Sequence, residues 1–565
     1  MPLAAAIASH DAKLGIGAGN QTARVIVVEA AAGPGPRLRA RSGGPVNAAN
    51  FASIAGQRAV RAMKILFVTS EFGDFAKAGG LADVSAALPR ALKRRGVDVR
   101  ILMPAYQNVL DKITQLKVVA SLPGHASIEP CLIGETETAD GITVYLILAP
   151  SLYQRPGTPY TTPEGYDWGD NDVRFARLGL AAAEVGKGIA SIGWTPDLVH
   201  CHDWPSALAP AYLAWSGARV PSVFTIHNLA HQGLFGADRL DALGIPHHAF
   251  RTDGVEFHGY ISFMKAGLVY ANHVTTVSNT YAAEITTDHL GSGLHGVTRD
   301  LAAEGRLSGI VNGLEAEWDP ATDRHLPKMF DADNLEGKRV NTDFIRMSLC
   351  LNSSDGPLFG VVSRLVHQKG LDLIAEIAGT VVERGGQIAI LGTGDPGVER
   401  MLLDVSRRYR GDIGLVAGFS DTMAHRLVAA SDFFLMPSRF EPCGLTQMQA
   451  QRYGALPVAH ATGGLADTIE NDETGFLFTD FSIRGFLEAT GRAFDTYHAP
   501  ERLAAMRRRA MAKSFGWDEP AKAYETLFSR VAGVPASKPP DRGFSGVTRL
   551  PQLISADMDR KAAAR

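Results

Sequence analysis

Short apolar runs alternate with segments of helical periodicity from Met63 onward. Runs of this kind, bounded by polar and glycine-rich segments, are typical of strands buried inside parallel sheets whose two faces are covered by helices. We predict strands at 63–70, 98–104, 141–149, 197–202, 221–226 and 273–278 in the first half, and at 357–364, 387–392, 413–418, 432–438 and 456–461 in the second. The pattern predicts an α/β protein with two doubly wound domains.

The two series of strands are separated by a polar stretch from about 309 to 356, which contains the turn-forming pair Asn312 and Gly313. We therefore predict a first domain at 63–308 and a second domain at 309–516. Residues 517–532 follow as a separate helix.

The ends of the chain differ in composition from these domains. Residues 1–62 are rich in Ala, Gly and Arg, and Met63 directly precedes the first clear strand. We expect residues 1–62 to be a flexible extension or the result of a wrongly assigned start. Residues 533–565 are polar and rich in Arg, Lys and Pro, which predicts a disordered tail.

Polar residues of chemical interest follow the predicted strands. Ligands of doubly wound domains bind beyond the carboxyl ends of the strands, so side chains at these positions share one crevice. The residues concerned are Glu71, Lys77, Asp203, Trp204, His227, Asn228, Arg364, Lys369 and Glu441. Their common placement predicts a single site in a deep cleft between the two domains.

The segment MPSRFEPCGLTQ (436–447) joins a predicted strand to a predicted helix. Gly444 allows a sharp turn, and the free amides at the start of the following helix favour a phosphate. Glu441 cannot serve a phosphate, because both are negatively charged, so its carboxylate is expected to accept hydrogen bonds from neutral hydroxyl groups. A sugar attached to a diphosphate meets both requirements.

The pentapeptide GGLAD occurs twice, at 79–83 and at 463–467, and each copy is predicted to open a helix. The paired glycines, Gly79 with Gly80 and Gly463 with Gly464, allow a close approach of the backbone to a ligand. Each Asp suits the dipole at the start of its helix. One such loop alone is more simply a tight connection, but two loops together with 436–447 favour a shared cleft.

Basic side chains near the predicted turns suit a diphosphate. Arg364 closes a strand and Lys369 follows five residues later, so a planar guanidinium and an ammonium can neutralise the same anion. Lys77, in the first glycine loop, can approach from the other domain when the cleft closes. A solvated rim is the alternative for each of these charges.

Three further polar positions have structural alternatives. His227 can be an ordinary hydrogen-bonded side chain, and Asp203 can be the N-cap of the helix that follows it. His200 and His202 alternate on a strand, but no third ligand of suitable spacing accompanies them. We therefore predict no metal site and no cofactor.

Composition narrows the choice of partners. The chain has 565 residues, with 45% hydrophobic and 20% charged residues and a net charge of -3, which suits two ordinary cores and gives no bulk attraction to nucleic acid or anionic membranes. No apolar run reaches the roughly 20 residues that a membrane span needs. The four cysteines form no CxxC pair, which favours a reducing cytoplasm.

Seven segments in order carry a resemblance to a known family. They are KAGGLADV, HCHDW, TIHNLAHQG, SRLVHQKG, LGTGD, PSRFEPCGLTQ and TGGLADT, within residues 63–532. The chain resembles bacterial glycogen synthases and plant starch synthases, which are glucosyltransferases of the GT-B fold, with two Rossmann-like domains that face a deep cleft. The resemblance implies transfer of glucose from ADP-glucose to the nonreducing 4-OH of an α-1,4-glucan such as glycogen. It also implies retention of configuration and no metal.

The resemblance implies roles for individual residues. Lys77 corresponds to the lysine that approaches the donor, Arg364 and Lys369 to the pair on the distal phosphate, and Glu441 to the residue that positions the glucose. The backbone of Cys443, Gly444, Leu445 and Thr446 corresponds to the phosphate loop, and Phe419 to the aromatic ring that stacks on adenine. Asp203, His227 and Asn312 correspond to the glucose pocket. Asn228 and the glycines of the two loops, Gly79, Gly80, Gly463 and Gly464, are expected to bind substrate.

Some positions depart from the pattern of the wider fold and family. Gln449 replaces a second glutamate, which leaves ribose binding open, and His231 and Pro205 stand where other residues are usual. The segment 517–531 resembles a final helix that crosses back to the first domain, with packing on the second domain as the alternative. The oligomeric state is not predicted.

Other functions remain open from the sequence. The same fold can work on UDP-glucose or on a short oligosaccharide acceptor, and a glucan-binding protein with lost catalysis is a different class. The intact set of charged residues argues against lost catalysis. A nicotinamide dehydrogenase is disfavoured because neither glycine loop has the dinucleotide pattern.

Overall fold

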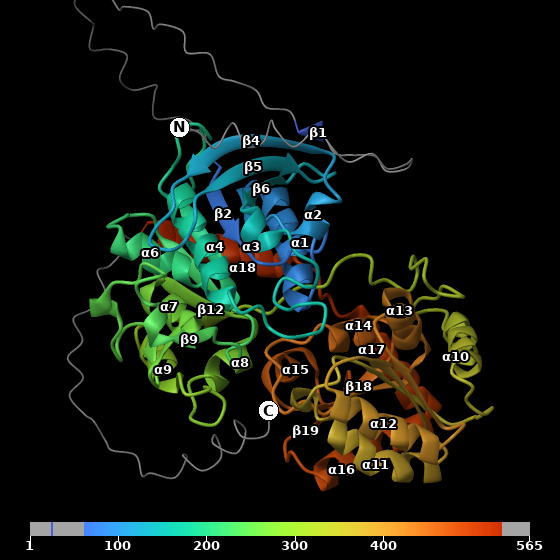
Figure 1. Cartoon of the computed structure of the whole chain (residues 1–565). Helices are drawn as coiled ribbons and strands as arrows, with labels where there is room; N and C mark the ends of the chain where they lie inside the picture. The colour runs from blue at the N-terminus through green and yellow to red at the C-terminus, as the bar shows by residue number, and fades with distance from the viewer. Residues whose placement is uncertain (1–23, 26–61, 534–565) are drawn as a thin grey trace, which may run out of the picture.

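Two α/β lobes, each built on a mostly parallel sheet, make up the computed structural model of the protein (Figure 1). The structure describes residues 24–25 and 62–533. The predicted extension 1–62 and tail 533–565 lie outside the described residues, apart from residues 24–25, 62 and 533.

The N-terminal lobe contains a ten-stranded sheet in the order β1-β4-β5-β6-β3-β2-β7-β8-β12-β13. Its strands are β1 (Arg24–Val25), β2 (Lys64–Val68), β3 (Asp98–Pro104), β4 (Gln115–Leu122), β5 (Cys131–Glu137), β6 (Thr143–Leu148), β7 (Leu198–His202), β8 (Ser222–Ile226), β12 (His273–Thr276) and β13 (Leu307–Gly309). Only β5 runs antiparallel to its neighbours, β4 and β6. The parallel centre places the carboxyl ends of β2, β7, β8 and β12 at one edge.

Helices and a small three-stranded sheet surround this sheet. The helices are α1 (Gly80–Arg94), α2 (Gln107–Leu110), α3 (Pro150–Tyr153), α4 (Asn171–Gly186), α5 (Asp203–Ser206), α6 (Leu208–Trp215), α7 (Phe263–Tyr270), α8 (Asn279–Glu284) and α9 (His295–Ala303). The small sheet has the order β10-β11-β9, from β10 (Glu256–Phe257), β11 (Tyr260–Ser262) and β9 (Leu234–Gly236). The first GGLAD copy opens α1, as predicted.

The C-terminal lobe contains a six-stranded sheet, parallel throughout, in the order β16-β15-β14-β17-β18-β19. Its strands are β14 (Leu358–Val362), β15 (Gln387–Gly392), β16 (Ile413–Ala417), β17 (Phe433–Met436), β18 (Leu456–His460) and β19 (Phe476–Phe478). Its helices are α10 (Glu336–Ser348), α11 (Leu371–Glu383), α12 (Pro396–Arg408), α13 (Asp421–Ala430), α14 (Thr446–Arg452), α15 (Gly463–Thr468), α16 (Ile483–Tyr497) and α17 (Pro500–Ala512). The second GGLAD copy opens α15.

The helix α18 (Asp518–Ala532) belongs to the core of the N-terminal lobe, although it follows the C-terminal lobe in sequence. Tyr524 and Phe528 are buried in the same cluster as the strands β2 and β7, and the helix packs on α1 (Figure 1). Packing on the C-terminal lobe, the alternative for this helix, is therefore not what the structure shows.

All eleven predicted strands are present, and 387–392 and 98–104 coincide with β15 and β3. The sequence prediction did not include the short strands β9, β10, β11, β13 and β19. It also missed the longer strands β4 and β5, in which buried residues are interrupted by partly or fully exposed ones, because this part of the sheet is antiparallel and one of its faces is less buried. The prediction looked for continuous apolar runs, which only a sheet covered on both faces produces.

The two lobes meet through α8 and α15. Asp467 of the second GGLAD copy accepts hydrogen bonds from the backbone of Asn279 (2.6 Å) and from the hydroxyl of Thr280 (2.5 Å). In return, the carboxylate of Glu284 accepts from the amide of Gly463 (3.0 Å). Asp467 therefore caps a helix of the other lobe, whereas the sequence suggested that it served the start of its own helix.

Candidate active site

A cavity of about 1030 Å³ lies between the lobes at the carboxyl ends of both sheets. Of the predicted site residues, its wall contains Lys77, Gly79, Gly80, Asp203, His227, Asn228, Asn312, Arg364, Lys369, Phe419, Glu441, Cys443, Gly444, Leu445 and Thr446. The structure does not bring Gly463 and Gly464 to this wall. They support it from behind, since a side chain on either would collide with the backbone of Glu441 or Cys443.

The first glycine loop is held by Glu71, which follows β2. Its carboxylate accepts hydrogen bonds from the amides of Ala78 and Gly79, both at 2.7 Å, and from the hydroxyl of Tyr160 at 2.6 Å. Burial raises the pKa of Glu71 despite these bonds. The residue thus shapes the loop from beneath, and the loop presents Gly79 and Gly80 to the cavity.

Lys77 forms an ion pair with Asp83, at 2.8 Å between Nζ and Oδ1, on the cavity wall. Burial opposes the charge on Lys77, but the carboxylate of Asp83 outweighs it and raises the pKa of the lysine. The predicted donor-binding lysine therefore stays charged, and Asp83 holds it at the start of α1.

Lys369 and Glu441 form the closest ion pair of the cavity. Lys369 Nζ lies 2.5 Å from Glu441 Oε2, and the hydroxyl of Ser438 donates to the same oxygen at 3.0 Å. Glu441 is 5% exposed, which makes it a fixed carboxylate rather than a solvated one. Its second oxygen, Oε1, makes no hydrogen bond within the described residues and is available to a ligand hydroxyl.

Arg364 follows β14 and is exposed on the cavity wall. Its guanidinium has no ion-pair partner in the part of the chain that the structure describes, so its donors are free for an anion. Burial lowers the pKa of His231, in the opposite lobe, and the positive charge of Arg364 lowers it further. The two lobes therefore face each other across this end of the cavity.

The loop before α14 contributes amide groups beside these cations. Gly444 has a φ of +68°, and this left-handed conformation turns the chain into the helix. Among residues 62–533, no acceptor takes the amide hydrogens of Gly444 and Leu445. Cations and free amides thus occupy one wall, as expected of a phosphate site.

Asp203 is buried at the carboxyl end of β7 and has a φ of +57°, a strained conformation for a residue with a side chain. Its Oδ1 accepts a hydrogen bond from the amide of His227 at 3.3 Å. Burial raises the pKa of Asp203 to about 7, although the hydrogen bond from His227 lowers it. The alternative N-cap role is not observed, because α5 begins at Asp203 itself and its cap has no side-chain hydrogen bond.

His227 leads into a buried row of imidazole rings. His227 Nε2 lies 3.0 Å from His202 Nδ1, and His202 Nε2 lies 3.3 Å from His200 Nδ1. Burial lowers the pKa of His227 to about 3, so the ring is neutral. The alternation of His200 and His202 along β7, which raised the question of a metal, thus serves hydrogen bonds between rings.

Asn312 and Phe419 complete the predicted set. The Oδ1 atom of Asn312 is buried and has no hydrogen-bond partner in the described structure, so a bound hydroxyl group can satisfy it. Phe419, in contrast, is 74% exposed after β16, which leaves its ring open to stacking. Burial raises the pKa of Cys443 to about 12, so this thiol is not a nucleophile.

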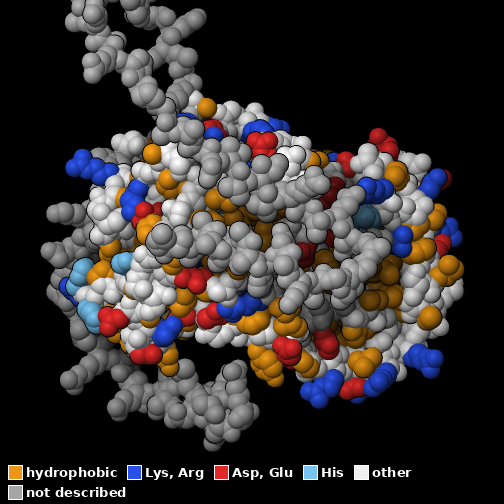
Figure 2. Space-filling view, turned by 45° about the horizontal axis from the view of Figure 1, so that its top comes forward, with side chains coloured by type: hydrophobic (Ala, Val, Ile, Leu, Met, Phe, Trp, Pro, Cys, Tyr) orange, Lys and Arg blue, Asp and Glu red, His pale blue; other side chains and the backbone are white. Residues whose placement is uncertain are grey.

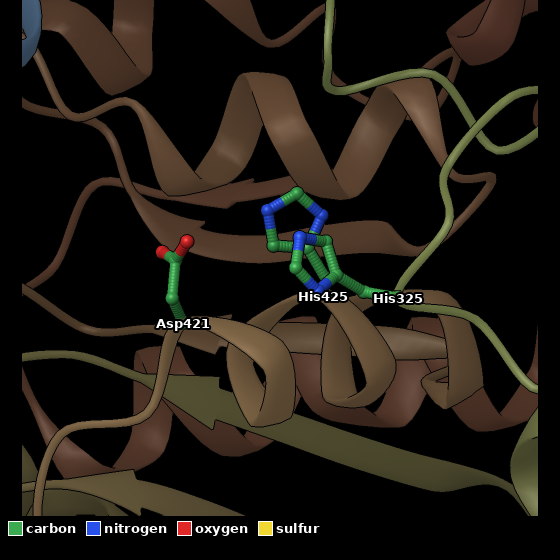
Figure 3. A group of neighbouring side chains, drawn as sticks. All are labelled: His325, Asp421 and His425. Atoms are coloured by element: carbon green, nitrogen blue, oxygen red, sulfur yellow. The ribbon is translucent and has the colours of Figure 1, made fainter.

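One cluster near the cavity has the residue types of a metal site: His325, Asp421 and His425 (Figure 3). Its rings already have partners, because His425 Nδ1 bonds to Asp323 at 2.7 Å and its face stacks on Trp318 at 3.7 Å. His325 Nδ1 bonds to the hydroxyl of Thr422 at 3.1 Å. These contacts tie the interdomain connection to α13 through one nitrogen of each ring.

Sequence reasoning missed several residues of the wall, among them Tyr160, Trp168, Glu315 and Trp517. Tyr160 and Trp168 come from the segment between α3 and α4, which has no strand pattern. Glu315 lies in the interdomain connection, and burial raises its pKa to about 7. The only sequence signal was the density of aromatic residues between 153 and 168.

Comparisons with known proteins show the family of the chain. The family model described as starch synthase catalytic domain matches residues 64–300, and the one described as glycosyl transferases group 1 matches residues 351–510. A glycogen synthase of Pseudomonas putida is 52% identical over 82% of this chain and 89% of its own. A glycogen synthase of Pseudomonas aeruginosa is 50% identical over 83% and 91%.

A solved structure is similar to this chain over most of its length. The catalytic domain of starch synthase IV from Arabidopsis thaliana, bound to ADP and acarbose, superposes with a TM-score of 0.75 at 32% identity, covering 84% of this chain and all of that one. The two facing Rossmann-like lobes and the interlobe cavity define a glycosyltransferase of the GT-B fold. Within this class, the chain belongs to the glycogen synthase and starch synthase family.

The charges on the surface give no further indication of a partner. Positive and negative side chains are interspersed over the face shown in Figure 2, and no single sign covers it. Among the helices of the described residues, none is long and apolar enough to cross a membrane.

Proposed function

We propose that the protein is a glycogen synthase that transfers glucose from ADP-glucose to the nonreducing 4-OH of an α-1,4-glucan, with retention of configuration and release of ADP. One observation carries the proposal: a single cavity is lined both by free anion-binding groups and by groups that can bind hydroxyls. Arg364 and the amides of Gly444 and Leu445 form the first set. The second set includes His227 and Asn312.

The relatives support the choice of substrates. Proteins named glycogen synthase share about half of this chain's residues over most of its length, and the related plant enzyme was solved with ADP and acarbose. Acarbose resembles an oligosaccharide, so the plant structure supports a glucan acceptor beside the nucleotide. Phe419, exposed at the cavity wall, is the ring on which the adenine stacks.

The difficult step is the departure of the diphosphate from the anomeric carbon. Arg364, Lys369 and the free amides before α14 stabilise the negative charge that develops on the leaving group. Lys77 adds a further cation from the glycine loop of the other lobe. The backbone carbonyl near His227 faces the positive charge that develops on the sugar ring.

Two groups orient the glucose. Glu441 accepts from a sugar hydroxyl through Oε1, while Lys369 holds its other oxygen at 2.5 Å. Asp203 accepts from the amide of His227 and so fixes the histidine loop at the edge of the cavity. Other carboxylates line the cavity, among them Asp167, Asp203 and Glu315, and we assign none of them as the nucleophile of a double displacement.

We further propose the division into domains at 63–308 and 309–516, a helix at 517–532 that returns to the first domain, a cytoplasmic location, and no cofactor. The contacts of α18 with the N-terminal core support the last boundary.

The test compares donors on the purified protein. With glycogen as acceptor, we expect ADP release from ADP-glucose without added metal, and glucose added to the glycogen at nonreducing ends. A much faster reaction with UDP-glucose would contradict the donor assignment. Binding of glycogen without any release of ADP would favour the alternative of a glucan-binding protein.

A further inference from the structure

We propose that His325, Asp421 and His425 form a binding site for a divalent transition-metal ion such as Zn²⁺, at the edge of the interlobe cavity (Figure 3). One ligand atom of each side chain lies within 4.8 Å of the other two. The ion takes no part in glucosyl transfer and acts as a regulator that weakens binding of the donor. The inference goes beyond the proposed function, and binding of the ion can be measured without any substrate.

Each histidine of the site offers one nitrogen. His425 Nδ1 lies 2.7 Å from Asp323 Oδ2. His325 Nδ1 lies 3.1 Å from the hydroxyl of Thr422, which can accept its hydrogen. Within the described residues, no hydrogen bond reaches Nε2 of either ring. The ring centroids are 4.6 Å apart, so both Nε2 lone pairs are within reach of one ion.

Asp323 holds His425 in the form that binds a cation. Its Oδ2 accepts hydrogen bonds from His425 Nδ1 and from the hydroxyl of Tyr453, both at 2.7 Å, and its Oδ1 accepts from the backbone amide of His325 at 2.8 Å. Trp318 fixes the plane of the His425 ring by stacking on it. In metal centres, a carboxylate that accepts the Nδ1 hydrogen orients the histidine and leaves Nε2 for the metal. The buried carboxylate of Asp323 provides this support before any ion binds.

Asp421 supplies the third ligand. It lies four residues before His425 on α13, so the two side chains project from the same face of the helix. Figure 3 shows its carboxylate beside the two rings. The side chain is exposed and forms no ion pair within the part of the chain that the structure describes. It is therefore free to turn toward the two imidazoles.

The ligand types select the ion. Two imidazole nitrogens and one carboxylate oxygen suit Zn²⁺, Co²⁺, Ni²⁺ or Cu²⁺, whereas Mg²⁺ and Ca²⁺ prefer oxygen ligands. Three protein ligands leave the fourth position of a tetrahedral site to water. The ligands come from the interdomain connection and from α13, which are far apart in the sequence. The sequence analysis considered only His200 and His202 and therefore predicted no metal site.

An ion at this site lies beside the proposed donor site. Asp421 lines the cavity two residues after Phe419. Burial lowers the pKa of Lys77, in the opposite lobe, and the carboxylates of Asp83 and Asp421 raise it. A bound ion cancels the attraction of Asp421 for Lys77 and adds a positive charge that repels it. Because Lys77 is the cation that we assign to the donor from the N-terminal lobe, the ion weakens binding of the donor.

The first test measures binding of the metal alone. Isothermal titration calorimetry with Zn²⁺, on metal-free protein without a histidine tag, should give one site of micromolar affinity. We expect His325→Ala and Asp421→Asn each to weaken it by about tenfold or more. The control is His247→Ala, which removes an exposed imidazole that lies 2.9 Å from Asp241, and it should bind as the wild type does. No micromolar site in the wild type, or equal affinity in the two variants and the wild type, overturns the proposal.

Spectroscopy checks the ligands. Co²⁺ in place of Zn²⁺ should show the visible absorption bands of a four-coordinate site. It should also quench the fluorescence of Trp318, because this ring lies 3.7 Å from that of His425. The quenched fraction should be absent from Trp318→Phe. Bands of a six-coordinate ion, or equal quenching in Trp318→Phe and the wild type, contradict the site.

The second test is kinetic. With glycogen as acceptor, saturating Zn²⁺ should raise the KM for ADP-glucose several-fold in the wild type and in His247→Ala, but not in His325→Ala. Without Zn²⁺, His325→Ala should have the activity of the wild type, because His325 is not part of the cavity wall. An unchanged KM in the wild type, or an equal rise in His325→Ala, overturns the effect on donor binding. A failure of the glycogen synthase assignment appears instead as absent transfer in the metal-free wild type, and it leaves the calorimetric test unaffected.

Discussion

Lys369 Nζ lies 2.5 Å from Glu441 Oε2, so the cation and the carboxylate of the proposed donor site neutralise each other. The sequence pointed to separate tasks, with Lys369 on the phosphate and Glu441 on the glucose. In the structure each residue sets the position of the other. The pair therefore binds both parts of the donor together: Lys369 contacts its phosphate, and Glu441 contacts a hydroxyl of its sugar.

Removal of one member of this pair should affect both turnover and stability. We expect Lys369→Met and Glu441→Gln each to lower kcat by at least a hundredfold. Each also leaves a partner unpaired in a mostly buried place, at a cost of roughly 2 kcal/mol in the free energy of unfolding. ADP release and thermal melting measure the two effects.

The double variant Lys369→Met/Glu441→Gln separates the effects. It leaves no unpaired charge, so its melting temperature should return toward that of the wild type while its activity stays low. A double variant that melts at the sum of the two single losses contradicts a direct pair.

Arg364 should act on the phosphate alone. Its guanidinium has no ion-pair partner among the described residues, so Arg364→Ala should leave the melting temperature unchanged. The loss of a charge-assisted bond of about 2 kcal/mol predicts a fall of about thirtyfold in kcat/KM for ADP-glucose, and Arg364→Lys should recover part of it. Arg384→Ala, on the exposed end of α11, is the control. Equal kcat/KM in Arg364→Ala and the wild type removes Arg364 from the site.

Phe419 should contribute to the binding of the nucleotide. Its ring is 74% exposed, so Phe419→Ala should not alter the melting temperature, but the loss of stacking of about 1 to 2 kcal/mol should raise the KM for ADP-glucose about tenfold. Phe419→Tyr should behave like the wild type, and Leu403→Ala, another partly exposed apolar side chain, is the control. Competition by free ADP measures the same contact without turnover.

Asp203 should make stability depend on pH. Its pKa is about 7 in the folded protein, above the ordinary value, because the carboxyl is buried. The folded state therefore binds the proton more tightly than the unfolded state, and the stabilisation is complete at low pH and lost as the pH rises from about 4 to about 7. The full difference is up to about 4 kcal/mol.

Asp203→Asn cannot titrate, so its melting temperature should fall less than that of the wild type between pH 5 and pH 8. Asp111→Asn, at an exposed position, controls for the removal of a charge. The same pH profile in Asp203→Asn and in the wild type would show that this carboxyl is ionised throughout.

Asp467 should hold the two lobes together. It caps α8 through bonds to Asn279 and Thr280, and loss of a cap costs about 1 kcal/mol. Asp467→Ala should lower the melting temperature by a few degrees and increase the radius of gyration in X-ray scattering, because the lobes lose a shared contact. Asp495→Ala, an exposed aspartate on α16, should change neither quantity.

The parallel sheets were predictable because both of their faces are buried. Strands such as β15 and β17 are apolar at nearly every position, and this pattern can be recognised without knowing which strands pair with each other. The antiparallel strands β4 and β5 were not predicted, since several residues of each strand face away from the core and interrupt the apolar run. The prediction of one crevice also followed from the strands, because their carboxyl ends lie on the same edge.

Pairings between residues far apart in sequence were not predictable. The second GGLAD copy resembles the first in its letters, yet Asp83 pairs with Lys77 of its own loop while Asp467 caps a helix of the other lobe. Likewise, His200 and His202 have a meaning only when β8 places His227 and Thr225 beside them. The register of β7 and β8 decides which of these histidine and threonine side chains meet.

The position of α18 has a consequence for synthesis on the ribosome. Phe528 and Val531 fill the core of the lobe that is translated first, so that lobe remains unfinished until more than two hundred later residues have emerged. The second lobe can fold while the first one waits. The nascent N-terminal lobe must therefore keep an apolar groove open for the returning helix, and a chaperone that shields this groove would raise the yield of native enzyme.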